Sequence, residues 1–197
     1  MRICLMYFFV FVASGAFAQT FPLSGSVTEE SSGQSWERSQ RWEEIRDIDG
    51  RFAILSPAAF RKTVDTIPTQ VGELVFHTYF LQSPTEEADN LIYMLSYVDY
   101  PEGSLHHDST DLVLEFLQAS QEEAIATVDG ELLFANDETL QGYPGRFWRI
   151  DYLDGEASIR TKTYVVGRRY YQVQTVSKTN SGLNDSSGRY LGSLRFF

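Results

Sequence analysis

Two neighbouring histidines followed by acids are the residues best suited to metal chemistry. His106, His107 and Asp108 are consecutive, and Asp111 follows about one helical turn later. Imidazole nitrogens and carboxylate oxygens are common ligands of divalent metals such as zinc. Adjacent side chains on a rigid element point apart, however, and acids are also favoured at the start of a helix by its dipole. We therefore treat these four residues as weak metal candidates and prefer the interpretation of a solvated helix start.

A second distinctive segment combines tyrosine, proline and glycine. In Gly142-Tyr143-Pro144-Gly145, the proline fixes φ and biases Tyr143 towards an extended backbone, while Gly145 permits a positive φ. The favoured interpretation is a bend that enters the next strand. The alternative is a ligand-facing loop in which Tyr143 and Arg146 are the contacts.

A basic and aromatic cluster follows a predicted hairpin turn. Arg168, Arg169, Tyr170 and Tyr171 are consecutive. Arginine and tyrosine are enriched among the residues that dominate protein interfaces. The favoured interpretation is a turn flanked by ordinary strand residues. The alternative, on an acidic protein, is that this tip contacts an acidic partner or an anionic head group.

Patterns of common catalytic sites are missing from the sequence. It contains no G-x-S-x-G nucleophile turn, no H-E-x-x-H zinc helix and no glycine-rich phosphate loop. His77 lies among apolar neighbours in an expected strand, where a half-buried structural histidine is the favoured interpretation. The sequence therefore predicts no catalytic residue and no cofactor. Because 27 acids offer many spatial pairs, a carboxylate-dependent hydrolase stays an alternative, and so does a metal-binding protein.

Composition narrows the class of protein. The chain has 197 residues and a formal net charge of −11, which a nucleic-acid backbone would repel. Its one cysteine cannot form an internal disulfide, so a disulfide scaffold is excluded. A hydrophobic content of 43% is enough to build a core, which excludes a disordered chain.

The N-terminus has the pattern of a secretory signal peptide. Arg2 supplies a positive charge, Ile3–Val12 is apolar, and Ala16-Phe17-Ala18 fits a cleavage site. We expect cleavage after Ala18, a secreted or periplasmic product and no transmembrane segment in that product. Cys4 precedes the apolar run, so lipid attachment is not expected and the mature chain has no thiol.

Hydrophobic periodicity and turn signals predict the elements that position these residues. Alternating or continuous apolar runs bounded by turn dipeptides predict strands, and one stretch has helical spacing throughout. Val71–Gln82 is apolar on both faces, so we expect it in the centre of a sheet. The other expected strands are Arg41–Ile48, Arg51–Leu55, Leu91–Val98, Glu131–Leu140, Arg146–Leu153, Glu156–Val166 and Arg169–Ser177. The expected helices are Ser109–Thr127, capped by Asp108, and Ser186–Leu194.

This element order predicts an α+β fold. Hairpin connections make neighbouring strands antiparallel. We expect a single antiparallel sheet of about six to eight strands, flanked by one long central helix and a short C-terminal helix. Residues 19–40 are rich in serine and predict a flexible polar linker, and residues 41–197 predict one domain.

The element order and four phrases resemble the PsbP-like superfamily. The phrases are Asp49–Ile54, Tyr97–Pro101, Gly142–Phe147 and Tyr164–Tyr171. This superfamily includes the extrinsic protein of photosystem II, a Ran-binding nuclear import factor and exported bacterial proteins of the DcrB type. The chain looks most similar to uncharacterised exported bacterial members. The resemblance implies a sheet flanked by helices and a binding or assembly role rather than catalysis.

The signal peptide and the resemblance together predict an exported binding or accessory protein that is not an enzyme. Its expected partner is a protein or an envelope component, and nucleic acid is not expected. The candidate contacts for that partner are Tyr143, Arg146, Arg168, Arg169 and Tyr170.

Overall fold

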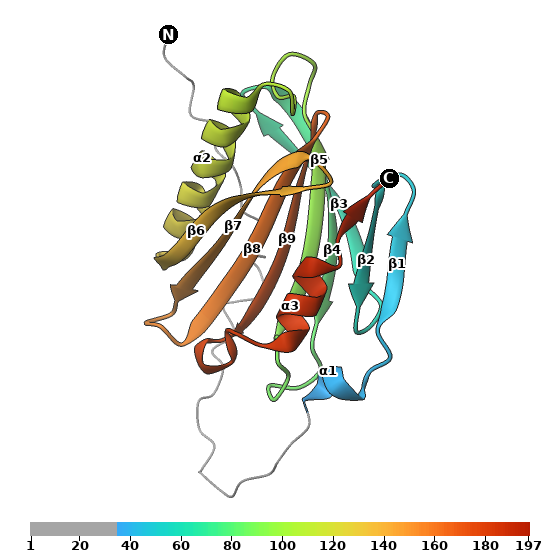
Figure 1. The fold of residues 1–197 in the computed structure, drawn as a ribbon, viewed down its shortest axis with the longest axis vertical. Coiled ribbons are helices and arrows are strands. Elements are labelled where there is room, and N and C mark those ends of the chain that lie inside the picture. The colour runs from blue at the N-terminus through green and yellow to red at the C-terminus, as the bar shows by residue number, and fades with distance from the viewer. Residues whose placement is uncertain (1–34) are drawn as a thin grey trace, which may run out of the picture.

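The computed structural model describes residues 35–197. The predicted signal peptide, its cleavage after Ala18 and residues 19–34 of the predicted linker lie outside the described residues. Within them, a seven-stranded antiparallel sheet runs in the order β3-β4-β5-β9-β8-β7-β6 (Figure 1). Its strands are β3 (Arg61–Thr69), β4 (Gly72–Gln82), β5 (Ile92–Asp99), β6 (Glu131–Leu140), β7 (Tyr143–Tyr152), β8 (Ala157–Val166) and β9 (Arg169–Lys178).

The predicted opening hairpin forms, but it belongs to a second sheet. The strands β1 (Glu43–Asp47), β2 (Phe52–Ser56) and β10 (Arg195–Phe196) make a three-stranded antiparallel sheet in the order β1-β2-β10. Because β2 pairs with β1 on one side and with β10 on the other, it has no free edge to offer the large sheet. The predicted α+β class is confirmed, with seven strands in the main sheet and the hairpin in a smaller one.

Two helices lie on opposite faces of the large sheet. The long helix α2 (Thr110–Val128) packs on β7 and β8, and α3 (Asp185–Gly192) packs on β8, β9 and β2 beside the small sheet (Figure 1). Successive strand residues point to opposite faces, so Val165 packs in the core under α2 whereas Tyr164 packs in the core beside α3. None of the helices within residues 35–197 is long and apolar enough to span a membrane.

The buried stripe of α2 agrees with the expected periodicity. Val113, Leu117, Ser120 and Ala124 are buried, and Phe116 packs against the same core. The N-cap prediction was wrong, because the N-cap residue is Ser109 rather than Asp108. The chain turns at His106–Asp108 before the helix starts, so the Asp108 carboxylate contacts the two histidines instead.

Strand β3 was not predicted, and its position explains why. It is the outermost strand of the large sheet, and most of its side chains are exposed or half-buried. It also contains Pro68, which lacks a backbone N–H and is tolerated at a sheet edge. Its presence makes β4 the second strand from the edge rather than a central one. Leu74 and Tyr79 of β4 are buried, but Val75 is 42% exposed.

The predicted linker extends six residues too far. Trp36–Ser39 form the short helix α1, and Glu37 is only 1% exposed. Its carboxylate accepts hydrogen bonds of 2.9 Å from the backbone N–H groups of Asp89 and Asn90 and from the Tyr93 hydroxyl. Residues 35–40 are therefore part of the folded domain.

Candidate functional site

An open hollow of about 820 Å³ lies where three segments far apart in the sequence meet. Arg51 comes from the turn between β1 and β2, and Asp99 from the end of β5. Gly167, Arg168 and Arg169 come from the turn between β8 and β9. Three of the four phrases that resemble the PsbP-like superfamily contribute residues to this hollow. The hollow therefore depends on long-range pairing rather than on one local motif.

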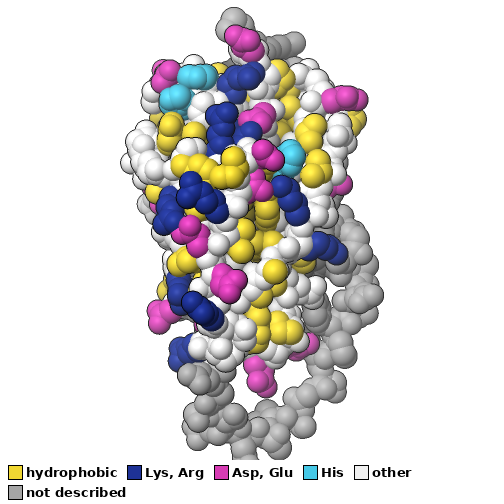
Figure 2. All heavy atoms as spheres, turned by 90° about the vertical axis from the view of Figure 1, so that its right-hand side faces the viewer, with side chains coloured by type: hydrophobic (Ala, Val, Ile, Leu, Met, Phe, Trp, Pro, Cys, Tyr) yellow, Lys and Arg dark blue, Asp and Glu magenta, His cyan; other side chains and the backbone are white. Residues whose placement is uncertain are grey.

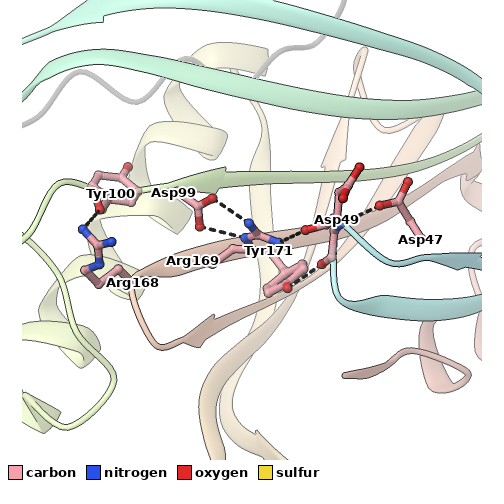
Figure 3. A network of polar contacts seen from close by, with 8 residues as sticks. Asp47, Asp49, Asp99, Tyr100, Arg168, Arg169 and Tyr171 are labelled. Carbon is pink, nitrogen blue, oxygen red and sulfur yellow. Dashed lines mark hydrogen bonds and ion pairs between the residues drawn. The ribbon is translucent and has the colours of Figure 1, made fainter. Parts of the chain in front are cut away.

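Arg169 joins the walls of the hollow (Figure 3). Its Nε and Nη2 atoms donate to the two oxygens of Asp99 at 2.7 and 2.6 Å. Its Nη1 atom donates to the backbone carbonyl of Asp49 at 2.6 Å, which ties the β1–β2 turn to the large sheet. Beneath it, the guanidinium carbon lies 4.5 Å from the centre of the Tyr97 ring, a cation–π contact.

This arrangement fixes the charge of both partners. Hydrogen bonds from Arg169 hold the pKa of Asp99 below its ordinary value, against the opposing effect of burial. Burial would lower the pKa of Arg169, but its hydrogen bond to Asp99 raises the pKa above the ordinary value. The pair therefore stays charged at neutral pH, with both carboxylate oxygens engaged.

The turn opposite Arg169 is held by a second network. Tyr171 donates from its hydroxyl to the Gly50 carbonyl at 2.7 Å. Asp47 accepts hydrogen bonds from the Gly50 backbone N–H, from Tyr79 and from Lys62. Burial alone would raise the pKa of Asp47, but these three hydrogen bonds lower it to about 2. The β1–β2 turn is thus held by hydrogen bonds of Gly50 with Tyr171 of the large sheet and with Asp47 of β1.

Arg51 and Arg168 are the exposed cations of the hollow. Neither forms an ion pair within the part of the chain that the structure describes, whereas Arg169 does. Arg168 donates one hydrogen bond, to the Tyr100 carbonyl at 3.3 Å. A guanidinium has five N–H donors, so both side chains have donors available for a ligand. Sequence reasoning proposed Arg168 and Arg169 but missed Arg51 and Asp99, whose only signal was the Asp49–Ile54 and Tyr97–Pro101 phrases.

His106, His107 and Asp108 do come together at the rim of the hollow. Their ligand atoms lie within 4.8 Å of one another, since this segment is a turn rather than a rigid element, and Asp111 lies outside the group. His107 Nδ1 accepts a hydrogen bond of 3.0 Å from the Gly167 backbone N–H. In the neutral ring the proton must then sit on Nε2, which faces Asp108 at 3.2 Å and has no lone pair for a metal. The geometry fits a hydrogen-bonded turn better than a metal site.

The other predicted contacts are distributed over different faces. Tyr170 is 3% exposed and packs edge-on against Phe116 of α2, so its prediction as a partner contact was wrong. Tyr143 and Arg146 are three positions apart on β7 and therefore point to opposite faces. Tyr143 packs near His107 and Phe196, whereas Arg146 donates to Gln121 of α2 at 2.7 Å. They do not form one ligand-facing loop.

His77 has a structural role in the same region. Its ring stacks on Tyr97 with the ring centres 4.5 Å apart and the planes at 7°. Burial and the nearby charge of Lys62 lower its pKa. It supports the aromatic ring on which Arg169 lies.

Comparisons with known proteins show the fold. No protein-family model matches the chain, and no curated protein sequence matches it. Among solved structures, the chain is similar to cyanobacterial PsbP (CyanoP) from Synechocystis sp. PCC 6803, with a TM-score of 0.53 and 13% sequence identity. The match covers 90% of this chain and 100% of that one. The chain therefore has a PsbP-like fold, as the sequence predicted.

Proposed function

We propose that the protein is an exported accessory protein, not an enzyme, that binds an acidic protein or envelope component at the hollow between the two sheets. The predicted signal peptide supports secretion or a periplasmic location. The PsbP-like fold fits an accessory role. The DcrB-type exported proteins are the part of the superfamily that this proposal favours.

The observation that carries the proposal is the pair of exposed arginines on two turns. Arg51 and Arg168 come from different sheets, and Arg169 ties these turns together through Asp99 and Asp49. Two guanidiniums on turns that are held in place suit the recognition of carboxylate or phosphate groups, because little backbone freedom is lost on binding. Figure 2 shows positive and negative side chains interspersed on the side of the molecule that carries the small sheet. Recognition would thus rest on local geometry rather than on a broad charged patch.

The state of Asp99 supports a binding role over hydrolysis. A general acid or base must exchange a proton near the operating pH. Asp99 has both oxygens bonded to Arg169 and a lowered pKa, so it is poorly suited to that role.

The test is affinity capture from an envelope extract with the tagged mature protein. The double variant Arg51→Gln/Arg168→Gln should lose the captured partner, and capture by the unchanged protein should weaken as salt rises. Arg61→Gln is the matched control, because Arg61 is an exposed arginine on β3 that contacts the Phe80 ring and does not line the hollow.

Three results would contradict the proposal. If the double variant captured the partner as well as the unchanged protein does, the hollow would not be the binding site. Turnover of a small substrate by the purified protein would contradict the accessory role. Export is tested separately by fractionation, and absence of the protein from the secreted and periplasmic fractions would contradict it. N-terminal sequencing of the exported chain should begin at Gln19, and an intact N-terminus would contradict cleavage after Ala18.

A further inference from the structure

Two arginines oppose each other on the large sheet at a place separate from the hollow. Arg149 on β7 and Arg160 on β8 are direct cross-strand partners, so their side chains leave the same face. This is the face on which α3 packs against β8 and β9. Like charges placed directly opposite one another destabilise a sheet. The two cations therefore need a compensating negative charge.

Protein groups compensate only one of the two. Asp151 accepts from Nε and Nη2 of Arg149 at 2.9 and 3.1 Å. Arg160 has no ion pair within residues 35–197, and its Nη1 atom donates to the Ser187 hydroxyl at 3.2 Å. Its Nε atom is buried and has no hydrogen-bond partner among those residues. A buried donor of a charged group left without a partner is costly.

The surroundings add a further cation and an aromatic surface. Arg160 and Lys162 both lie over the Phe147 ring, 5.3 and 5.1 Å from its centre. Glu138 pairs with Lys162 at 3.0 Å, so three cations face two carboxylates and one positive charge is in excess. Burial and the charge of Arg149 both lower the pKa of Arg160. This excess is notable in a chain whose net charge is −11.

The loop after β9 leaves room for this arrangement. A Cβ atom on Gly182 would lie 2.9 Å from Nη2 of Arg149, so a side chain there would displace the guanidinium. Ser187 of α3 is shared between Arg160 and Thr175, at 3.2 and 2.7 Å. Gly182 of the loop therefore packs against Arg149, and Ser187 of α3 accepts a hydrogen bond from Arg160.

We propose that Arg149 and Arg160 form a binding site for a small oxyanion, a phosphate or a carboxylate, on this face of the sheet. The guanidinium group presents paired N–H donors that match oxyanions, and a bound anion would neutralise the cross-strand repulsion. The site goes beyond the proposed function, because neither arginine lines the hollow.

Inorganic phosphate is the first probe. Titration of the ¹⁵N-labelled protein should produce a saturating shift of the Arg160 Nε–H signal and raise the midpoint of thermal unfolding. Sodium chloride at the same ionic strength should do neither. Succinate is the second arm: a saturating response to it would assign carboxylates to the site, and a response to phosphate alone would assign phosphate.

Variants separate a specific site from general charge effects. Arg160→Gln should weaken phosphate binding by about tenfold or more, and Arg160→Lys should give an intermediate loss because it keeps the charge without the paired donors. Arg61→Gln, on the exposed edge strand β3 and in neither site, should bind phosphate normally. Circular dichroism checks that each variant is folded, and Arg149→Gln provides a second variant should Arg160→Gln fail to fold. The proposal would be overturned if neither anion gave a response beyond that to chloride, or if the Arg149→Gln and Arg160→Gln variants bound phosphate as well as the unchanged protein does.

Discussion

Asp99 on β5 and Arg169 on β9 lie directly opposite one another and are joined by two N–H···O hydrogen bonds. The same guanidinium bonds to the carbonyl of Asp49, in the turn of the other sheet. One side chain therefore couples the pairing of two central strands to the docking of the small sheet. The hollow exists because this coupling holds the turn with Arg51 beside the turn with Arg168.

Replacement of Arg169 should loosen both sheets at this point. Arg169→Lys keeps the charge but loses the paired geometry and the bond to Asp49, and we expect a loss of about 1–2 kcal/mol in the free energy of unfolding. Arg169→Gln should lower the free energy of unfolding further, because the charge of Asp99 is then left without its partner. Urea unfolding measures both variants, with Arg61→Gln as the control. A stability equal to that of the unchanged protein would show that the pair does not join the sheets.

Asp47 should contribute to the acid sensitivity of the protein. Its pKa falls from 3.8 in the unfolded chain to about 2 in the folded one, so its contribution is fully present above about pH 4. That contribution, about 1 kcal/mol because solvent screens part of the interaction, is lost as the pH falls through 4 towards 2. Asp47→Asn should therefore destabilise the protein at pH 7 and reduce the slope of stability between pH 4 and 2. Urea unfolding across this range measures the slope, with Glu43→Gln in the exposed strand β1 as control; an unchanged slope in Asp47→Asn would contradict the assignment.

Local signals were sufficient for the part of the sheet built from hairpins. The dipeptides Asp154-Gly155 and Gly167-Arg168 mark the β7–β8 and β8–β9 turns of the meander, and strand alternation gives its buried faces. The same alternation places Tyr170 on the face opposite Arg169 and Tyr171. The prediction treated these residues as one surface cluster and so assigned a core residue to the interface.

Long-range contacts account for what the sequence did not reveal. Arg51 and Asp99 are 48 positions apart, and they share the hollow only because β5 pairs with β9 while the β1–β2 turn bonds to Arg169. No periodicity within either segment encodes that pairing. The opposition of Arg149 and Arg160 likewise depends on the register between β7 and β8. Strand β3 was missed because an exposed edge strand has no buried alternation to detect.

Glu37 should anchor the N-terminal end of the described domain. Its buried carboxylate accepts from two backbone N–H groups and from Tyr93, so Glu37→Ala would leave three donors without a partner. We expect Glu37→Ala to lower the free energy of unfolding by about 2–4 kcal/mol. Glu37→Gln should lower it less, because its side chain keeps one oxygen that can accept hydrogen bonds. Limited proteolysis should then cut the alanine variant near α1 before the rest of the domain. Glu43→Ala, in the exposed strand β1, is the control. If Glu37→Ala resisted protease as well as the control, the anchor would be disproved.

Gly145 and Gly188 should respond in opposite directions to substitution by alanine. A Cβ on Gly145 would lie 2.5 Å from the Thr163 carbonyl oxygen and 2.7 Å from Cε1 of the Tyr164 ring, so β7 and β8 would have to separate. We expect Gly145→Ala to destabilise the protein by about 2 kcal/mol. Gly188 lies inside α3 with no atom within 4 Å of the Cβ position, so Gly188→Ala should stabilise by about 0.5–1 kcal/mol by restricting the unfolded chain. Thermal unfolding of the two variants measures whether each substitution raises or lowers stability. A stabilising effect of Gly145→Ala would mean that β7 and β8 are not packed as closely as described.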